Sequence, residues 1–347
     1  MILLFMGLAT ADAAEHHLVR PGQTFTAIAR QLGDPELADE IAQLNQMDID
    51  AVLTPGTLID VPTTADAVTG PPAQIASLKG SGQLYLPPNA RALPIRIGQD
   101  LPPDTLVCTD DGSFVRIRLT VQHDTFLHDE VSLMPSTCLR IAQLVSRPDG
   151  RKSTLVLANG SVSVRETDGR GELILLSEDG VTTGAQGGFR VTREEGATRT
   201  EATNGRVAVL SGGQEVRLDP GEGSRTRRGL PPTPATALLP AGALDRPKPD
   251  AILYRADFIW RPVPGALGYR IEIAADSDFT DLLVVEDVDH TRWEPELLFL
   301  PTARSAVWWR VSAFDRAGFQ GLSDEIRTVR YPTGVGTQPD PASPAPP

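Results

Sequence analysis

The chain has 347 residues, more than one ordinary domain needs, and its formal net charge is −13. Residues 15–62 hold 2 basic and 8 acidic side chains, residues 90–228 hold 18 and 19, and residues 244–332 hold 11 and 15. Because none of these segments is basic, we expect no nucleic-acid partner and no binding of a polyanion by general electrostatics. Composition divides the chain into three folded segments of a multidomain, mainly β protein.

The N-terminus begins with an apolar run from Met1 to Leu8. Ala11-Asp12-Ala13 follows with the small-x-small pattern of a signal-peptide cleavage site. No Lys or Arg precedes the run, so residues 1–13 are interpreted as an atypical signal peptide, and a buried N-terminal segment is the alternative. The run is shorter than the roughly 20 residues that cross a bilayer. We therefore expect an exported, soluble, periplasmic protein that does not span the membrane.

Residues 15–62 have the pattern of a small β-α-α-β module. Apolar residues recur at helical spacing from Phe25 to Leu32 and again from Leu37 to Leu44. Short β patterns at Leu18-Val19 and Leu58–Val61 flank the two helices. A module this small has little core to spare for a deep cleft, so we expect a shallow binding site.

Three motifs of this module resemble those of LysM domains: residues 19–29 (VRPGQTFTAIA), the Leu44-Asn45 pair and the Leu53–Leu58 turn. The resemblance implies binding of N-acetylglucosamine-containing glycans, in bacteria usually peptidoglycan, in a groove between the loop after strand one and the loop before strand two. Backbone groups at two turns can pair with acetamido groups while an apolar side chain lies against the sugar. The glycan-binding residues implied are Gly22, Gln23, Thr24, Phe25, Val52, Leu53, Thr54, Pro55 and Gly56.

Structural roles compete with ligand contacts for several of these residues. Pro-Gly turns occur in any fold, and Phe25 and Ile28 are interpreted as core residues more readily than as ligand contacts. Asn45 is interpreted more readily as a helix stop than as a sugar contact.

Residues 63–83 are rich in Thr, Ala, Pro and Gly and are predicted to form a semi-flexible linker. From residue 84 to residue 228 short β patterns alternate with turn pairs such as Asn159-Gly160 and Asn204-Gly205. Regular hairpins with no helical period predict an all-β sandwich or an elongated rolled sheet.

Residues 84–228 contain five motifs of interest: Ile97–Leu101, Thr109–Ser113, Gly184–Val191, Asn204–Val209 and Asp219–Gly223. These motifs resemble those of a FecR-type domain. In iron-responsive regulators this domain is the periplasmic part that receives a signal from an outer-membrane receptor. Those regulators also have a cytoplasmic helical region and one membrane span, and neither pattern is found in this sequence.

Cys108 and Cys138 are the only cysteines, and both lie in β patterns of this segment. Two interpretations stay open. A disulfide would be worth on the order of 3 kcal/mol in the chain-entropy model, whereas two buried reduced thiols need no particular distance between their Cα atoms.

One cluster of imidazole and carboxylate groups invites a metal interpretation: His123, Asp124, His128, Asp129 and Glu130. A spacing of five places the two histidines on opposite faces of a strand, and exposed polar positions on a sheet explain all five residues. We therefore expect no metal and no cofactor.

The C-terminal third begins with a second predicted linker, residues 229–249, which is rich in Pro and Ala. Residues 250–332 contain strict alternation at Tyr269–Ile273 and an aromatic-rich β pattern at Val307–Phe314, and resemble a fibronectin type III-like sandwich. Trp260 and Trp309 are interpreted as core rather than as a sugar-stacking platform. Residues 333–347 are predicted to be a disordered tail.

No motif typical of an enzyme is present, neither a phosphate-binding loop nor a nucleophile elbow. We therefore expect a non-catalytic periplasmic protein that binds peptidoglycan through its first module and tethers two β domains to the cell wall, where they contact an envelope protein. The alternative is an envelope sensor or regulator related to FecR-type signal transducers. A third, weaker alternative is an enzyme whose site no motif reveals.

Overall fold

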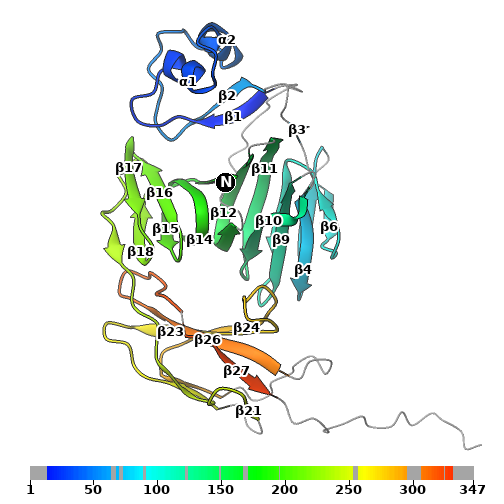
Figure 1. Ribbon diagram of the computed structural model, residues 1–347, viewed down its shortest axis with the longest axis vertical. Helices are drawn as coiled ribbons and strands as arrows, with labels where there is room; N and C mark the ends of the chain where they lie inside the picture. The colour runs from blue at the N-terminus through cyan, green and yellow to red at the C-terminus, as the bar shows by residue number, and fades with distance from the viewer. Residues whose placement is uncertain are drawn as a thin grey trace, which may run out of the picture. The chain divides into compact units, whose positions relative to one another are not determined.

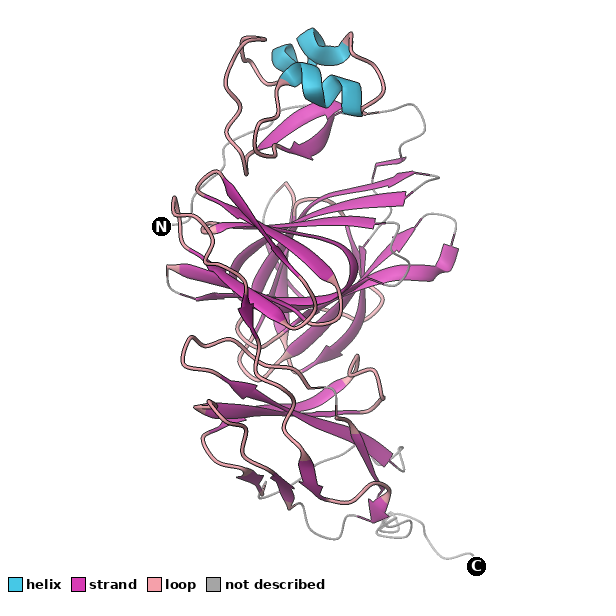
Figure 2. Cartoon of the chain, turned by 60° about the vertical axis from the view of Figure 1, so that its left-hand side comes forward, coloured by secondary structure: helices cyan, strands magenta, loops and turns pink. Residues whose placement is uncertain are grey.

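The computed structural model describes residues 14–63, 68–69, 73–88, 91–121, 124–147, 150–166, 171–194, 196–252, 257–294, 306–323 and 325–330. The predicted signal peptide and C-terminal tail lie outside the described residues. The chain is mainly β (Figures 1 and 2), which confirms the predicted fold class. It divides into two compact units, residues 1–238 and residues 239–347.

The first unit starts with the β-α-α-β module that the sequence predicts. Its elements are β1 (Ala14–Leu18), α1 (Phe25–Gln31), α2 (Leu37–Leu44) and β2 (Leu58–Pro62). The two strands pair antiparallel, and Figure 1 shows both helices over one side of this hairpin. The helices and strands enclose a small apolar core of Val19, Phe25, Ile28, Ala29, Ala38, Ile41, Ala42, Leu53, Ile59 and Val61.

The remainder of the first unit, here called the middle domain, consists of strands that form two facing layers. One layer has the order β7-β4-β9-β10-β12-β14-β15-β18-β19. The other has the order β6-β5-β8-β11-β12-β13-β14-β16-β17, with β3 also paired to β11. The long strands β12 and β14 belong to both layers, so the sheet is rolled, as the sequence predicts.

The bounds of these strands are β3 (Val68–Thr69), β4 (Ala73–Lys79), β5 (Gly82–Leu86), β6 (Arg91–Pro94), β7 (Asp100–Leu101), β8 (Thr105–Thr109), β9 (Phe114–Val121), β10 (Asp124–Leu133), β11 (Cys138–Arg147), β12 (Gly150–Glu166), β13 (Gly171–Ser177), β14 (Gly180–Glu194), β15 (Ala197–Ala202), β16 (Arg206–Ser211), β17 (Gln214–Leu218), β18 (Glu222–Thr226) and β19 (Thr236–Ala237). Inward-facing aliphatic side chains such as Ile75, Ile117, Leu139 and Val164 fill the space between the layers. Successive side chains of a strand point to opposite faces, so the alternation of apolar and polar residues places the apolar ones between the layers.

Both predicted linkers differ from the structure. Within residues 63–83, β4 pairs with β9, and Ala73 and Ile75 are fully buried. Within residues 229–249, β19 pairs with β18 and β20 pairs with β22. The two segments resemble spacers because Pro, Ala, Thr and Gly are frequent in them as a whole, and only pairing with other strands makes parts of them belong to a sheet.

The second unit contains two sheets. The smaller has the order β20-β22-β25, and the larger has the order β21-β27-β26-β23-β24. The indoles of Trp260 and Trp309 lie in its core, exposed by 2% and 0%, as the sequence predicts. The bounds are β20 (Leu244–Arg246), β21 (Ala251–Ile252), β22 (Phe258–Trp260), β23 (Gly268–Ala274), β24 (Leu282–Val288), β25 (Arg292–Trp293), β26 (Ala306–Phe314) and β27 (Arg327–Arg330).

Candidate functional site

The two loops predicted to hold a ligand lie side by side because the backbone of Val19 joins them. The Val19 N–H donates to the carbonyl of Thr57 at 2.9 Å, and the Val19 carbonyl accepts from the Gly56 N–H at 2.8 Å. Residue 19 therefore fixes the start of the first loop, residues 20–24, against the end of the second loop, residues 52–57. The structure thus brings together the two predicted halves of the site.

Glycine is required at the turn of each loop. The φ angle is +78° at Gly22 and +90° at Gly56, in the left-handed region that other residues rarely adopt. No atom lies within 4 Å of the position that a Cβ of Gly22 would occupy, so backbone conformation rather than lack of space requires this glycine.

The side chain of Gln23 stabilises the first loop from within. Its Oε1 accepts a hydrogen bond from the Arg20 N–H at 2.8 Å and lies 3.2 Å from Nε2 of His17. Its Nε2 donates to Oε1 of Gln31 at 3.1 Å. Thr24 is also occupied, because its Oγ1 accepts from the Ala27 N–H and caps α1. These two side chains shape the loop.

The nine predicted contact residues separate by burial. Phe25 and Leu53 are 0% and 6% exposed and belong to the module core, so their side chains support the loops and do not face a ligand. Val52 is 91% exposed, although it is β-branched and apolar. Gly22, Thr24 and Thr54 are exposed, and Gln23, Pro55 and Gly56 are half-buried. Among the nine residues, Val52 is therefore the one large apolar side chain that is exposed to a ligand.

Asn45 connects α2 to β2. Its Nδ2 donates to the carbonyls of Ile41 and Asp60, both at 2.7 Å, and its Oδ1 accepts from the Asp60 N–H at 2.8 Å. The interpretation as a helix stop agrees with its place as the C-cap of α2. Sequence reasoning missed the bond to β2, because the partner lies 15 residues away and nothing local indicates it.

Two adjacent histidines, His16 and His17, lie on β1. Burial lowers the pKa of His16, against the opposing effect of Asp60, whose Oδ1 lies 3.9 Å from Nε2 of His16. Burial likewise lowers the pKa of His17, against the hydrogen bond to Gln23. The structure therefore favours neutral imidazoles at both positions.

The charges around the loops favour a neutral ligand. Asp48 and Asp50 are exposed on the connection that leads to Val52. Negative charge at this place repels a polyanion, whereas a neutral acetamido sugar suffers no such penalty. An exposed apolar side chain beside turns with backbone hydrogen-bonding groups is suited to a flat, amide-bearing ligand.

Two carboxylates of the histidine-containing cluster, Asp129 and Glu130, are buried, so the expectation of exposed positions on a sheet was wrong for them. Asp129 is 1% exposed and forms an ion pair with Arg151, and Glu130 is 8% exposed and accepts from Arg116 at 2.9 Å. His123 and the side chain of His128 lie outside the described residues. Among the residues that the structure describes, no group of three or more His, Cys, Asp or Glu residues is placed to hold a metal.

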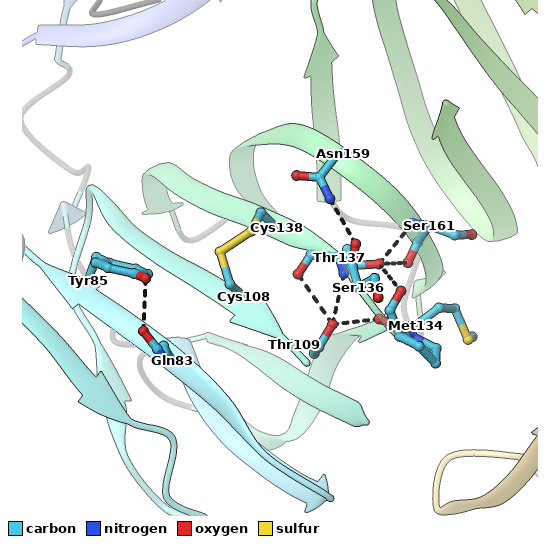
Figure 3. Close-up of a disulfide and its surroundings, with 11 residues drawn as sticks. Gln83, Tyr85, Cys108, Thr109, Met134, Ser136, Thr137, Cys138, Asn159 and Ser161 are labelled. Carbon is cyan, nitrogen blue, oxygen red and sulfur yellow. Dashed lines mark hydrogen bonds between the residues drawn. A yellow bond between two sulfur atoms is a disulfide. The ribbon is translucent and has the colours of Figure 1, made fainter. Parts of the chain in front are cut away.

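Cys108 and Cys138 form a disulfide (Figure 3), which decides between the two interpretations. They lie directly opposite each other on β8 and β11, with their Cα atoms 4.2 Å apart. Their neighbours Val107 and Leu139 point into the core, so the disulfide lies on the outer face of its layer and is half-buried.

Two motifs of the FecR resemblance meet in the structure. Backbone N–H groups of Thr203 and Asn204 donate to the Gly188 carbonyl at 2.9 and 3.2 Å. A Cβ on Gly187 would lie 2.6 Å from the carbonyl oxygen of Asn204, so only glycine fits there. The Gly-rich motif in β14 therefore packs against the Asn204-Gly205 turn.

No family model matches the sequence, and no curated protein matches it. Two crystal structures of a putative anti-sigma factor from Parabacteroides distasonis, at 15% and 16% identity and a TM-score of 0.29, match 38% of this chain and 60% of theirs. The FN1-FN3 domains of chicken CNTN1, at 13% identity and a TM-score of 0.21, match over 79% of this chain and 92% of that one. These similarities are too low to support an argument about function.

The helices α1 and α2 have 7 and 8 residues. Within the described ranges, none combines the length and the apolar character that crossing a bilayer requires.

Proposed function

We propose that this protein binds an N-acetylglucosamine-containing glycan, peptidoglycan in particular, through the paired loops of its β-α-α-β module, and that its β domains contact an envelope protein. The observation that carries the proposal is the placement of Val52. This β-branched side chain is 91% exposed and precedes the left-handed turn at Gly56, in the loop that the backbone of Val19 holds against the first loop. Covering such a side chain with a sugar face is favourable, because it removes apolar surface from water.

The LysM resemblance of residues 19–29, 44–45 and 53–58 supports the same ligand class. The proposal assigns binding rather than catalysis to these loops. It also includes a periplasmic location, which the disulfide between Cys108 and Cys138 supports because such bonds persist in oxidising compartments.

The test is Val52→Asp in the full chain, measured by sedimentation with purified peptidoglycan and by titration with N-acetylglucosamine oligomers. Covering a Val side chain is worth about 1.5 kcal/mol, so we expect affinity to fall roughly tenfold. Ile97→Asp is the matched control, because Ile97 is an exposed apolar residue of the middle domain, at 64%. Equal binding by both variants and the unmodified chain would exclude the loops as the glycan site.

We propose an envelope sensor as the second candidate. The packing of Gly187 against Asn204 supports it, since two separate FecR-type motifs form one local structure. Crosslinking of the intact protein in an envelope preparation tests this candidate. Capture of an outer-membrane receptor through residues 84–228 would favour the sensor, and capture of peptidoglycan alone would favour the tether.

A further inference from the structure

The hairpin of the module rests on the middle domain through an apolar contact. Leu18 and Leu58 lie opposite each other on β1 and β2. They pack with side chains of β13, β14 and β16, namely Ile174, Leu176, Val181 and Leu210. Burial of this apolar surface stabilises the contact, so the module packs against the middle domain as well as being joined to it by the chain.

Polar contacts surround this apolar contact. Gln143 of β11 forms two hydrogen bonds with the backbone of β1. Its Oε1 accepts from the His16 N–H at 2.7 Å, and its Nε2 donates to the Ala14 carbonyl at 3.0 Å. Lys152 of β12 lies 3.6 Å from the buried carboxylate of Glu15. The edge of β1 therefore has partners in the middle domain that a free module would lack.

Arg20 links this contact to the candidate glycan site. Its guanidinium lies 3.3 Å from Glu172 of β13 and 3.3 Å from Glu215 of β17. Its backbone forms the turn of the first loop with Gln23, since the Arg20 N–H donates to Oε1 of Gln23 and the Gln23 N–H donates to the Arg20 carbonyl at 3.2 Å. One residue thus carries both the contact with the middle domain and the hydrogen bonds of the loop.

The second loop also borders the middle domain. A Cβ on Gly56 would lie 3.7 Å from Cδ2 of Leu210, which is ordinary van der Waals contact. Leu210 itself belongs to the apolar cluster beneath the hairpin. Both candidate ligand loops are therefore held from the same side.

We propose that Arg20 is a positioning residue for the glycan site and that Glu172 and Glu215 act through it, so that the binding site belongs to the module and the middle domain together. This inference rests on the proposed function for its ligand. The carboxylates fix the guanidinium, the guanidinium fixes the backbone of residue 20, and that backbone holds Gln23 and the first turn. The middle domain contributes to affinity without touching the sugar.

The experiment is a double-mutant cycle in the full chain, with Arg20→Ala, Glu215→Gln and the combination. The first readout is affinity for N-acetylglucosamine oligomers, and the second is amide hydrogen exchange of residues 20–24 without ligand. Exposed ion pairs are worth a fraction of a kcal/mol, so each single substitution is expected to weaken binding roughly threefold and to accelerate exchange by a similar factor. The combination is expected to be no worse than either single variant.

Arg30→Ala is the matched control, because Arg30 is an exposed arginine on α1 of the same module. Arg20→Glu with Glu215→Arg and Glu172→Gln restores the attraction to position 215 with the charges exchanged and removes the carboxylate at position 172 that would repel the new one. This variant is expected to recover binding and slow exchange. Additive effects of the two single substitutions, or no change in exchange, would overturn the inference. Faster exchange in variants of a chain that binds no glycan would support the positioning role and refute the proposed function.

Discussion

Asp129 on β10 and Arg151 on β12 form an ion pair inside the middle domain, with side chains only 2% and 4% exposed. The Arg151 Nε donates to Oδ2 of Asp129 at 2.5 Å, and a second guanidinium nitrogen donates to Oδ1. Asp129 lies on a strand of one layer, and Arg151 lies on the part of β12 that pairs within the other layer. The ion pair therefore connects the two layers of the rolled sheet.

We expect Asp129→Ala to destabilise the middle domain by about 3 to 5 kcal/mol, because the buried Arg151 guanidinium loses this ion pair. Denaturant unfolding monitored on the full chain measures the loss. Asp129→Leu combined with Arg151→Met replaces both charges and is expected to cost much less. A loss below about 1 kcal/mol for the single substitution would contradict the buried pair.

The disulfide of β8 and β11 closes a loop with a sequence separation of 30 residues. Replacing both Cys108 and Cys138 by Ser is expected to lower the free energy of unfolding by on the order of 3 kcal/mol, because the unfolded chain regains freedom. Urea unfolding with and without a thiol reductant checks this value. The reductant should destabilise the unmodified protein and leave the double variant unchanged.

Stability is expected to fall as the pH drops below about 6.5, the ordinary histidine pKa. Burial lowers the pKa of His16 and of His17 in the folded state, so the unfolded chain binds these protons more readily. Their contribution is complete above the unfolded pKa and is lost as the pH falls through the folded values. Thermal unfolding at pH 7.5 and pH 5.5 measures it.

The charged neighbours of these histidines are Asp60, Lys152, Asp104, Glu15, Glu172 and Arg20. His17→Gln is expected to reduce the pH dependence, whereas His290→Gln, at a side chain that is 64% exposed, should leave it intact. Identical pH profiles for the unmodified chain and His17→Gln would refute a role for His17.

Asn45→Ala is expected to destabilise the module by about 1 to 3 kcal/mol, because the backbone N–H of Asp60 and two carbonyls lose their shared partner. Hydrogen exchange of β2 measures the effect. Asn45→Asp retains the acceptor for Asp60 but loses the two donated bonds, and it is expected to recover part of the loss. Gln46→Ala, at the exposed neighbouring position, serves as the control.

Much of the fold can be predicted from local sequence patterns. Helical spacing from Phe25 to Leu44 and β alternation elsewhere specify the module and the mainly β fold, because burial of one face is a local property of the pattern. The sequence also places Trp260 and Trp309 in a core, since large aromatic side chains rarely stay exposed. Left-handed turns at Gly22 and Gly56 follow equally from residue type.

The disulfide, the buried ion pair and the contacts behind the ligand loops depend on long-range pairing and could not be predicted in this way. Whether Cys108 meets Cys138, whether Asp129 is buried, and whether residues 73–79 form a spacer or β4 depend on which strands pair across long sequence separations. The contact of Arg20 with Glu172 and Glu215 is of the same kind, because partners 152 and 195 residues away leave no local signal. Local sequence determines the turns of the ligand loops, whereas residues distant in sequence provide the contacts that hold these loops in place.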